Sequence, residues 1–367
     1  MKIKKLTFIN HKTGWNIKDA QFDNTTLLVG ASGVGKTQIL RALQILSNIA
    51  IGYSFEGIEW SINFSQEGKD YQWEGEFGSA SGKEPLSFTG GGMYPIVKEC
   101  LMERETELIQ RSKSTLLYRG KETVKLDSYT SALCLLKEEE CVNSPAEAFN
   151  QVYELDVDET LPPFNTISNE LLVNVQTLEY IKKKRLTSVI ANLFLLKKNK
   201  LPEFKYVRDT FISIFPLVEE IDFTLIRESE NVIYTELHIR EKGVDSLISY
   251  EEMSSGMRRA LSQIVSLTLA KDGDVILIDE FENGLGVNCI DLLADLVRNP
   301  DADVQMIITS HHPYIINTIP TSQWKVVTRN GSDVSIHNAS ELNIGTHSHH
   351  DAFMQLLQTN AYKTGQL

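Results

Sequence analysis

The chain has 367 residues, 42% of them hydrophobic, with 36 basic and 49 acidic side chains and a net charge of −13. Its length leaves room for one large α/β domain with an insertion or for two domains. The acidic balance argues against a protein that simply coats nucleic acid. No apolar run approaches the roughly 20 residues that span a membrane, the amino terminus is too quickly polar for a secretory signal, and the four cysteines lack metal-ligand spacing. We therefore expect a cytoplasmic protein with no membrane partner.

The first motif is a glycine-rich loop between a strand and a helix. Residues 25–29 are β-branched or apolar and predict a buried strand, and residues 38–49 carry apolar side chains at helical spacing. Between them stand Gly30, Ala31, Ser32, Gly33, Val34, Gly35, Lys36 and Thr37. Such glycines let backbone N–H groups face phosphate oxygens at the positive end of a helix. Lys36 can reach the β- and γ-phosphates and Thr37 can offer its hydroxyl to Mg²⁺, so the pattern predicts a P-loop.

The middle of the chain carries no comparable motif. Residues 58–65 and 71–77 predict strands, glycines within 78–82 and 90–92 predict turns, and residues 93–220 are mostly helical by pattern. Pro162, Pro163 and Pro202 punctuate this region, which lacks the sustained heptads of a long coiled coil. A basic cluster comprises Lys182, Lys183, Lys184, Arg185, Lys197, Lys198 and Lys200. The cluster predicts a solvated helix face, with a surface that binds DNA or RNA as the alternative.

Three further motifs follow in order. Residues 253–259 read Met-Ser-Ser-Gly-Met-Arg-Arg before an apolar helical run, where Ser254 or Ser255 can cap the helix and N–H groups near Gly256 can face an anion. Residues 275–280 predict a buried parallel strand. This strand ends in Asp279, which can hold Mg²⁺, and Glu280, which can act as general base on a water. A strand at 306–310 then precedes His311, which can contact a γ-phosphate.

In this order the motifs resemble the ABC-type ATPase heads of SMC, RecF-like and OLD-family proteins. The chain is most similar to the stand-alone AAA-family ATP-binding proteins called AAA_21, and the resemblance covers nearly its whole length. The matches are residues 3–10 with the first strand, 30–37 with Walker A, 253–257 with the signature motif, 276–280 with Walker B, 282–285 with the D-loop and His311 with the switch histidine. In such heads two subunits sandwich two ATP molecules. The resemblance implies that Ser254 and Gly256 of one subunit face the γ-phosphate held by the other.

The chain departs from the family pattern at several positions. Ser32 replaces the usual asparagine, Ser255 replaces a glycine, Met257 replaces a glutamine or glutamate, and Gly286-Val287 replaces a His-Pro pair. The Q-loop glutamine has four candidates, namely Gln66, Gln72, Gln110 and Gln151. These changes leave ATP binding as the expectation and bear mainly on the rate of hydrolysis.

The resemblance implies an α/β fold, a P-loop NTPase of the ABC/SMC-head type with a mixed central sheet and a mostly helical insertion. We expect an ATPase lobe with Walker A at 1–92, the helical insertion at 93–220, and a lobe with the signature, Walker B, D-loop and switch histidine at 221–367. Strands are expected at 221–227, 232–240 and 324–328, and Asp351 is expected to cap a final helix through Gln358. His347, His349 and His350 beside Asp351 predict a solvated loop, with a metal site as the alternative.

The implied function is an ATP-driven conformational switch that uses Mg²⁺, with Glu280, His311 and Lys36 as the catalytic residues. Its partners are a second copy of itself, in a head-to-tail dimer or higher homo-oligomer, and a separate effector protein in bacterial defence against phage. Only 56 residues follow His311, too few for the TOPRIM nuclease domain of OLD-family proteins, so effector chemistry is expected on another polypeptide. The alternatives are a RecF- or SMC-type ATPase that acts directly on nucleic acid in repair or maintenance, and a nucleotide-binding module with little turnover.

Overall fold

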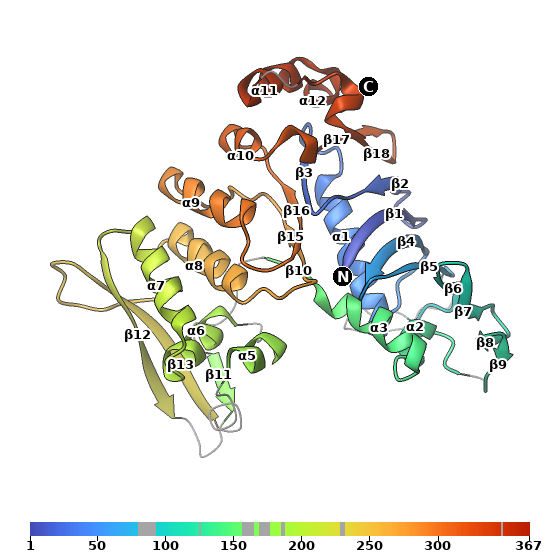
Figure 1. Ribbon diagram of the computed structural model, residues 1–367, viewed down its shortest axis with the longest axis horizontal. Coiled ribbons are helices and arrows are strands. Elements are labelled where there is room, and N and C mark those ends of the chain that lie inside the picture. The colour runs from blue at the N-terminus through green and yellow to red at the C-terminus, as the bar shows by residue number, and fades with distance from the viewer. Residues whose placement is uncertain are drawn as a thin grey trace. The chain divides into compact units, whose positions relative to one another are not determined.

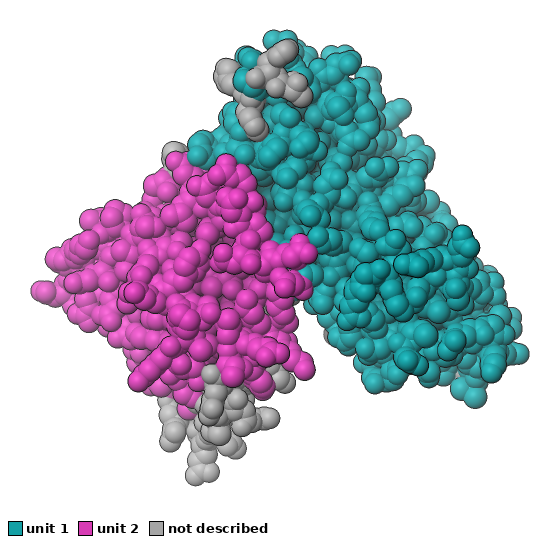
Figure 2. Space-filling view, viewed as in Figure 1, with its two compact units in different colours: residues 1–154, 273–281, 304–367 teal, residues 155–272, 282–303 magenta. Residues whose placement is uncertain are grey.

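The chain forms two compact units, drawn in separate colours in Figure 2. The computed structural model describes residues 1–79, 93–124, 126–155, 165–168, 177–184, 188–227, 232–345 and 348–367. Unit 1 comprises Met1–Glu154, Gly273–Phe281 and Val304–Leu367, and unit 2 comprises Leu155–Asp272 and Glu282–Asp303. Among the described helices, none is long and apolar enough to cross a membrane.

Unit 1 contains a long mixed sheet with helices packed against it (Figure 1). Its strands are β1 (Lys2–Asn10), β2 (Asn16–Gln21), β3 (Thr25–Val29), β4 (Ile58–Gln66), β5 (Lys69–Phe77), β6 (Ile96–Glu103), β7 (Thr106–Arg111), β8 (Leu116–Tyr118), β9 (Lys121–Glu122), β10 (Val152–Glu154), β15 (Val275–Ile278), β16 (Gln305–Thr309), β17 (Trp324–Asn330) and β18 (Asp333–Asn338). Its helices are α1 (Lys36–Ala50), α2 (Ala132–Leu135), α3 (Glu140–Ala148), α10 (Pro313–Thr318), α11 (His349–Gln358) and α12 (Asn360–Lys363), with single turns η1 (Phe149–Gln151), η2 (Thr321–Gln323) and η3 (Ala339–Leu342).

The first half of this sheet is parallel. Across the described strands the order is β10-β15-β16-β3-β17-β18-β2-β1-β4-β5-β6-β7-β8-β9, and neighbours from β10 to β17 run in the same direction. Every residue of β15 and β16 is buried, as a sheet covered on both faces requires. Because the strands are parallel, the carboxyl ends of β3, β15 and β16 meet at one edge. Gly30, Asp279 and Ser310 directly follow these three strands at that edge.

The second half of the sheet, from β2 to β9, is antiparallel and has one buried face. In β4 the side chains at 58, 60, 62 and 64 are buried and alternate with half-buried residues, as expected for a half-covered sheet. The rings of Trp60 and Trp73 meet edge to face at 5.1 Å, and those of Trp73 and Phe149 at 4.9 Å. Apolar side chains of α1, including Leu43 and Leu46, complete the same core.

Unit 2 combines a small antiparallel sheet with helices. Its elements are β11 (Asn165–Ser168), α5 (Leu178–Lys184), α6 (Val189–Lys198), α7 (Pro202–Ile214), β12 (Val218–Arg227), β13 (Val232–Glu241), β14 (Ile248–Ser249), α8 (Ser255–Thr268) and α9 (Val287–Arg298). β13 pairs with β12 along its length, and with β11 and β14 on its other side. Ile221, Leu237 and Ile239 are buried on one face of this sheet, where Phe194 of α6 meets Phe223 edge to face at 5.5 Å.

Three parts of the predicted division are wrong. The mostly helical region was expected from residue 93, but residues 96–122 form β6 to β9 and extend the antiparallel sheet. Their Glu, Lys, Leu and Met residues have helix-forming propensities, which pairing with β5 overrides. The first unit boundary lies at residues 154 and 155, and not near residue 92. The strands expected at 221–227 and 232–240 exist as β12 and β13, but they belong to unit 2 and not to the lobe that carries Asp279.

The prediction that Asp351 caps the last long helix is also wrong. Ser348 is the N-cap of α11, since its hydroxyl accepts a hydrogen bond from the Asp351 N–H at 3.1 Å and donates one to the Asp351 carboxylate at 2.7 Å. Asp351 is therefore the third residue of α11 and forms a capping pair with Ser348. The longest described helix, α1, has 15 residues.

Some predictions lie outside the described residues. They concern the turns within residues 80–92, the prolines at 162 and 163, Arg185 and His347, together with the side chains of Lys184, His349 and His350. Within the described part of the basic cluster, two lysines serve the packing of unit 2. Lys182 donates to the Ala270 carbonyl at 2.9 Å, and Lys197 donates to Asp222 at 2.8 Å. These two ammonium groups are engaged inside the unit, which reduces the charge available for a nucleic-acid surface.

Candidate nucleotide-binding site

The glycine-rich loop of residues 30–35 connects β3 to α1 in unit 1. Gly30 and Gly35 have φ angles of 151° and 107°, a region that side-chain-bearing residues avoid. A Cβ at Gly30 would lie 2.6 Å from the Val327 carbonyl oxygen, and one at Gly35 would lie 2.9 Å from a methyl group of Val334. The loop is therefore packed tightly against β17 and β18, with its backbone curled ahead of the α1 amino terminus. This is the geometry that presents N–H groups to an anion.

A cavity of about 220 Å³ opens in front of this loop. Its lining residues are Trp15, Ser32, Gly33, Gly35, Lys36, Thr37, Gln38, Asp279, Glu280, Thr309 and His311. The cavity is smaller than the roughly 300–1,000 Å³ of pockets that enclose a whole drug-sized ligand. It therefore suits phosphates and a cation better than an entire nucleotide. Among the predicted site residues of unit 1, Gly30, Ala31 and Val34 are not in this lining.

Lys36 lies at the first position of α1 and is 6% exposed. Its ammonium group donates to the carbonyl oxygens of Gly30 and Ala31, both at 3.0 Å. Its cation is thus held at the phosphate-binding loop itself. A phosphate in the cavity would be met by this fixed positive charge and by the partial positive charge of the α1 amino terminus.

Three oxygen-bearing side chains converge across the cavity from α1, β15 and β16. The Thr37 hydroxyl donates to Asp279 Oδ1 at 3.2 Å, and the Thr309 hydroxyl donates to the same oxygen at 2.6 Å. A hydroxyl and a carboxylate are hard oxygen ligands of the kind that Mg²⁺ prefers. The donor set of Thr37 and Asp279 therefore fits a magnesium ion, although 242 residues separate the two in sequence.

Glu280 is exposed and has the unusual backbone angle φ 43°. For a residue with a side chain this left-handed conformation costs roughly 1–2 kcal/mol. Its N–H donates to the Thr309 hydroxyl at 2.7 Å, and the next N–H, of Phe281, donates to the Thr309 carbonyl at 3.0 Å. These bonds to β16 hold a tight turn immediately after β15. The turn places Glu280 among the residues that line the cavity, together with His311.

The remaining predicted site residues, Ser254 and Gly256, belong to unit 2 and are not among the lining residues of the cavity. Ser254 is the N-cap of α8, because its hydroxyl accepts from the Met257 N–H at 3.2 Å. A Cβ at Gly256 would lie 2.9 Å from the Gly284 carbonyl oxygen. Only a glycine allows the D-loop backbone to approach the start of α8 this closely, so the predicted signature and D-loop lie together in unit 2.

Four cavity neighbours were not predicted from sequence. Trp15, Gln38 and Thr309 line the cavity, and Arg329 supports it from outside. The Arg329 guanidinium lies 4.4 Å from the centre of the Trp15 ring and donates to the Gly33 carbonyl at 3.2 Å. Of these four residues, only Gln38 could have been found from the sequence, because it directly follows the P-loop. None of the four glutamines proposed for the Q-loop lines the cavity, and the side chain of one of them, Gln151, accepts from the amino group of Met1 at 2.8 Å.

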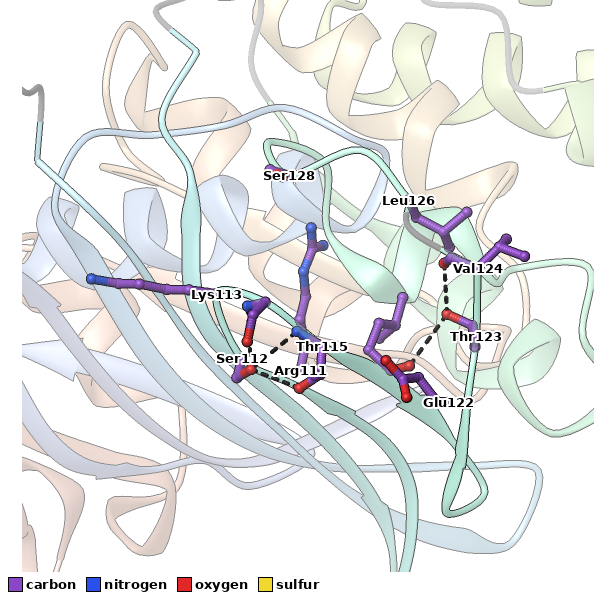
Figure 3. A pocket seen from close by; sticks show the side chains of 11 residues that line it. Arg111, Ser112, Lys113, Thr115, Glu122, Thr123, Val124, Leu126 and Ser128 are labelled. Carbon is purple, nitrogen blue, oxygen red and sulfur yellow. Dashed lines mark hydrogen bonds between the residues drawn. The ribbon is translucent and has the colours of Figure 1, made fainter.

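A second, smaller cavity of about 70 Å³ lies at the far end of the antiparallel half-sheet (Figure 3). Figure 3 shows Ser112 beside Thr115 on one wall and Thr123 beside Val124 on another. The hydroxyls of Ser112 and Thr115 bond each other at 2.8 Å, and Thr123 donates to the Val124 carbonyl at 3.0 Å. The Arg111 guanidinium donates to the carbonyls of Thr130 and Asp127. The polar groups here hold the sheet end to the following loop.

Comparison with known proteins identifies the family. Residues 25–317 match the family AAA_21, which is described as "AAA domain, putative AbiEii toxin, Type IV TA system". The chain belongs to this family. The matched range includes the P-loop, Asp279, Glu280 and His311 of this AAA_21 chain. No curated protein matches the chain.

Solved structures of SMC head domains are similar over most of the chain. An SMC head bound to the winged-helix domain of ScpA has 14% identity and a TM-score of 0.48, and the match covers 92% of this chain and 98% of that one. An SMC head with an extended coiled coil, bound to the carboxyl-terminal domain of ScpA and derived from Pyrococcus furiosus, has 13% identity and a TM-score of 0.47, covering 92% and 96%. The SMC head domain from Thermotoga maritima has 14% identity and a TM-score of 0.42, covering 92% and 99%.

Proposed function

We propose that this AAA_21 protein binds ATP together with Mg²⁺ in the unit 1 cavity and hydrolyses it to ADP and phosphate. The observation that carries the proposal is the shared lining of one cavity by Lys36, Thr37, Asp279, Glu280 and His311. A phosphate loop, a pair of carboxylates and a histidine from distant segments meet at one sheet edge. Open parallel sheets bind their ligands at this edge.

The roles follow from the side chains. Lys36 and the loop N–H groups bind phosphate oxygens, and Thr37 and Asp279 hold Mg²⁺, which when bound neutralises charge on those oxygens. Glu280 accepts a proton from the attacking water, and His311 hydrogen-bonds the terminal phosphate.

We further propose that ATP closes a head-to-tail dimer, in which Ser254 and Gly256 of the second subunit contact the γ-phosphate. The start of α8 supports this proposal, because a capped helix terminus with a glycine can approach an anion closely. Closure and reopening would act as a switch on a separate effector protein. The family description, which names a toxin and a type IV TA system, supports a role in bacterial defence against phage.

The test of hydrolysis compares the wild type with Glu280→Gln. We expect release of phosphate from Mg–ATP by the wild type and a loss of roughly a hundredfold or more in the variant, because general bases contribute about 10²–10⁴-fold. Glu138→Gln, an exposed carboxylate elsewhere in unit 1, is the matched control and should hydrolyse normally. Equal rates in all three proteins would remove Glu280 from the reaction.

The dimer is tested by light scattering on Glu280→Gln, in which ATP stays bound. We expect the mass to double on addition of ATP and Mg²⁺, and the doubling to disappear when Ser254→Arg is added. An ATP-bound protein of unchanged mass would contradict the ATP-dependent dimer while leaving hydrolysis standing.

A further inference from the structure

Thr309, the last residue of β16, bonds three consecutive residues of the neighbouring turn. Its hydroxyl donates to Asp279 Oδ1 at 2.6 Å and accepts from the Glu280 N–H at 2.7 Å, and its carbonyl oxygen accepts from the Phe281 N–H at 3.0 Å. Thr309 is 1% exposed and lies in unit 1 with the whole turn. One side chain thus connects the metal-binding carboxylate to the backbone of the general base.

The hydrogen-bond directions define what each atom can do. A hydroxyl has one proton and two acceptor sites, and the Thr309 proton is directed to Asp279 Oδ1. That oxygen also accepts from the Thr37 hydroxyl at 3.2 Å. Both threonines therefore bond the same carboxylate oxygen. This arrangement fixes the rotation of the Asp279 carboxylate toward the P-loop.

The same hydroxyl stabilises an unfavourable backbone. Glu280 has φ 43° without being a glycine, and such conformations persist only where surrounding contacts enforce them. The Glu280 N–H has the Thr309 hydroxyl as its partner, so removing that oxygen removes a bond that holds the turn. The direction of the Glu280 side chain from its Cα depends on this turn.

We propose that Thr309 is a positioning residue that sets the geometry of both carboxylates, Asp279 for the cation and Glu280 for the water. The proposal rests on the proposed ATP hydrolysis at this site. It assigns to Thr309 no contact with the nucleotide, so its loss acts on the chemical step and leaves binding through the P-loop in place.

The decisive variants are Thr309→Val, which keeps the shape and removes the hydroxyl, and Thr309→Ser, which keeps the hydroxyl. A small misplacement of a catalytic group costs up to about a hundredfold in rate. We therefore expect Thr309→Val to lower kcat by roughly ten- to a hundredfold with KM and ATP affinity within about twofold of wild type. Thr309→Ser should recover most of kcat.

Thr26→Val is the control, because Thr26 is also buried in this sheet and its hydroxyl bonds the backbone of the nearby Asp23. It should leave kcat unchanged at a comparable loss of thermal stability. Equal losses of kcat in Thr26→Val and Thr309→Val would show a general structural effect and overturn the proposal. Wild-type kcat in Thr309→Val would overturn it as well.

A second measurement needs no activity. Amide hydrogen exchange of the nucleotide-free protein reports the Glu280 N–H through the peptide that contains residues 279–281. We expect exchange there to accelerate in Thr309→Val and to stay slow in Thr309→Ser. If the wild type proved inactive, the proposed hydrolysis would fail, yet this measurement would still decide whether Thr309 holds the turn. Unchanged exchange in Thr309→Val would overturn the assignment.

Discussion

Arg329 connects the phosphate loop to the carboxyl-terminal part of unit 1. Its backbone N–H donates to the Gly365 carbonyl at 2.7 Å, and its guanidinium donates to the Gly33 carbonyl at 3.2 Å. In a planar trans peptide the C=O and the following N–H point in opposite directions. Holding the Gly33 carbonyl toward Arg329 therefore turns the Val34 N–H to the other side of the loop. Gly365 adds to this brace, because a Cβ there would lie only 2.4 Å from a methyl group of Val34.

We predict that Arg329→Ala weakens Mg–ATP binding by roughly two- to twelvefold, the equivalent of about 0.5–1.5 kcal/mol for one hydrogen bond. Binding of a fluorescent ATP analogue measures the effect. The Mg–ATP affinity of Arg329→Lys should lie between those of the wild type and Arg329→Ala, since lysine keeps the charge and loses the planar guanidinium fork. Arg41→Ala, an exposed arginine on α1, is the control. Equal affinities in Arg329→Ala and Arg41→Ala would show that the loop needs no such brace.

Glu99 is a buried carboxylate with a purely structural set of partners. It is 2% exposed, and its Oε1 accepts from Trp73 Nε1 at 3.0 Å, from the Ser131 hydroxyl at 2.6 Å and from the Leu133 N–H at 3.2 Å. Its Oε2 accepts from the Ala132 N–H at 2.6 Å. Both oxygens act only as acceptors, and the charge lies at the amino terminus of α2.

Glu99→Gln is expected to destabilise the protein by about 1–3 kcal/mol, because the amide nitrogen would face a donor and leave a buried N–H unpaired. Thermal unfolding at neutral pH measures the loss, with the exposed Glu105→Gln as control. A melting temperature that is the same in both variants would contradict the acceptor-only account.

At this scale the sequence predicted residues that belong to local motifs. The P-loop, Asp279 and Glu280 were identifiable because each follows a recognisable strand. Trp15, Thr309 and Arg329 were not, because the fold alone brings them to the loop from three separate segments. Their single-residue signals are no different from those of many other surface or strand residues.

At the scale of elements, the strands β3, β15 and β16 of the parallel half were predictable, whereas β10 and the antiparallel edge from β6 to β9 were not. The apolar runs that became β3, β15 and β16 are wholly or almost wholly buried, and burial on both faces leaves a plain hydrophobic signal. In β6 and β7 buried residues alternate only incompletely with half-buried or exposed ones, and two of the buried residues, Glu99 and Arg111, are charged. The alternation of buried and exposed residues in these strands is short and is broken by a bulge. The helix-forming composition of the segment therefore favoured the wrong prediction.

Packing between β4 and β5 gives an element-scale prediction at Gly75. A Cβ there would lie 2.4 Å from Cζ2 of Trp60, which is 2% exposed. We expect Gly75→Ala to destabilise the protein by about 1–3 kcal/mol, the usual cost of overpacking. Gly78→Ala is the control, since an added Cβ meets nothing nearer than 3.5 Å. Chemical denaturation of both variants should separate them, and equal midpoints would show that Trp60 can move aside freely.

At the scale of the whole molecule, the proposed chemistry is divided between the two units. The P-loop and both carboxylates belong to unit 1, whereas the proposed signature serine belongs to unit 2. The cysteines report on each unit separately. Burial raises the pKa of Cys100 to about 11 and also raises the pKa values of Cys134 in unit 1 and Cys289 in unit 2. Cys100 and Cys134 are half-buried and Cys289 is buried. Because the thiolate is the reactive form, alkylation of these thiols at neutral pH should accelerate on local or global opening.

We predict that Mg–ATP slows alkylation of Cys100 and Cys134 whether or not the protein dimerises. Alkylation of Cys289 should slow only if Ser254 of unit 2 binds the nucleotide held by a second subunit. A ligand at about 100 times its Kd stabilises the bound unit by about 2.7 kcal/mol, so labelling that requires unit 1 to open should slow by roughly a hundredfold. Mass spectrometry of labelled peptides from Glu280→Gln, with and without Mg–ATP, gives both rates. In the dimer, Ser254 makes unit 2 part of the site, so Cys289 is also protected and Ser254→Arg abolishes that protection alone. Protection restricted to unit 1 would mean that ATP binds one head without recruiting the signature serine.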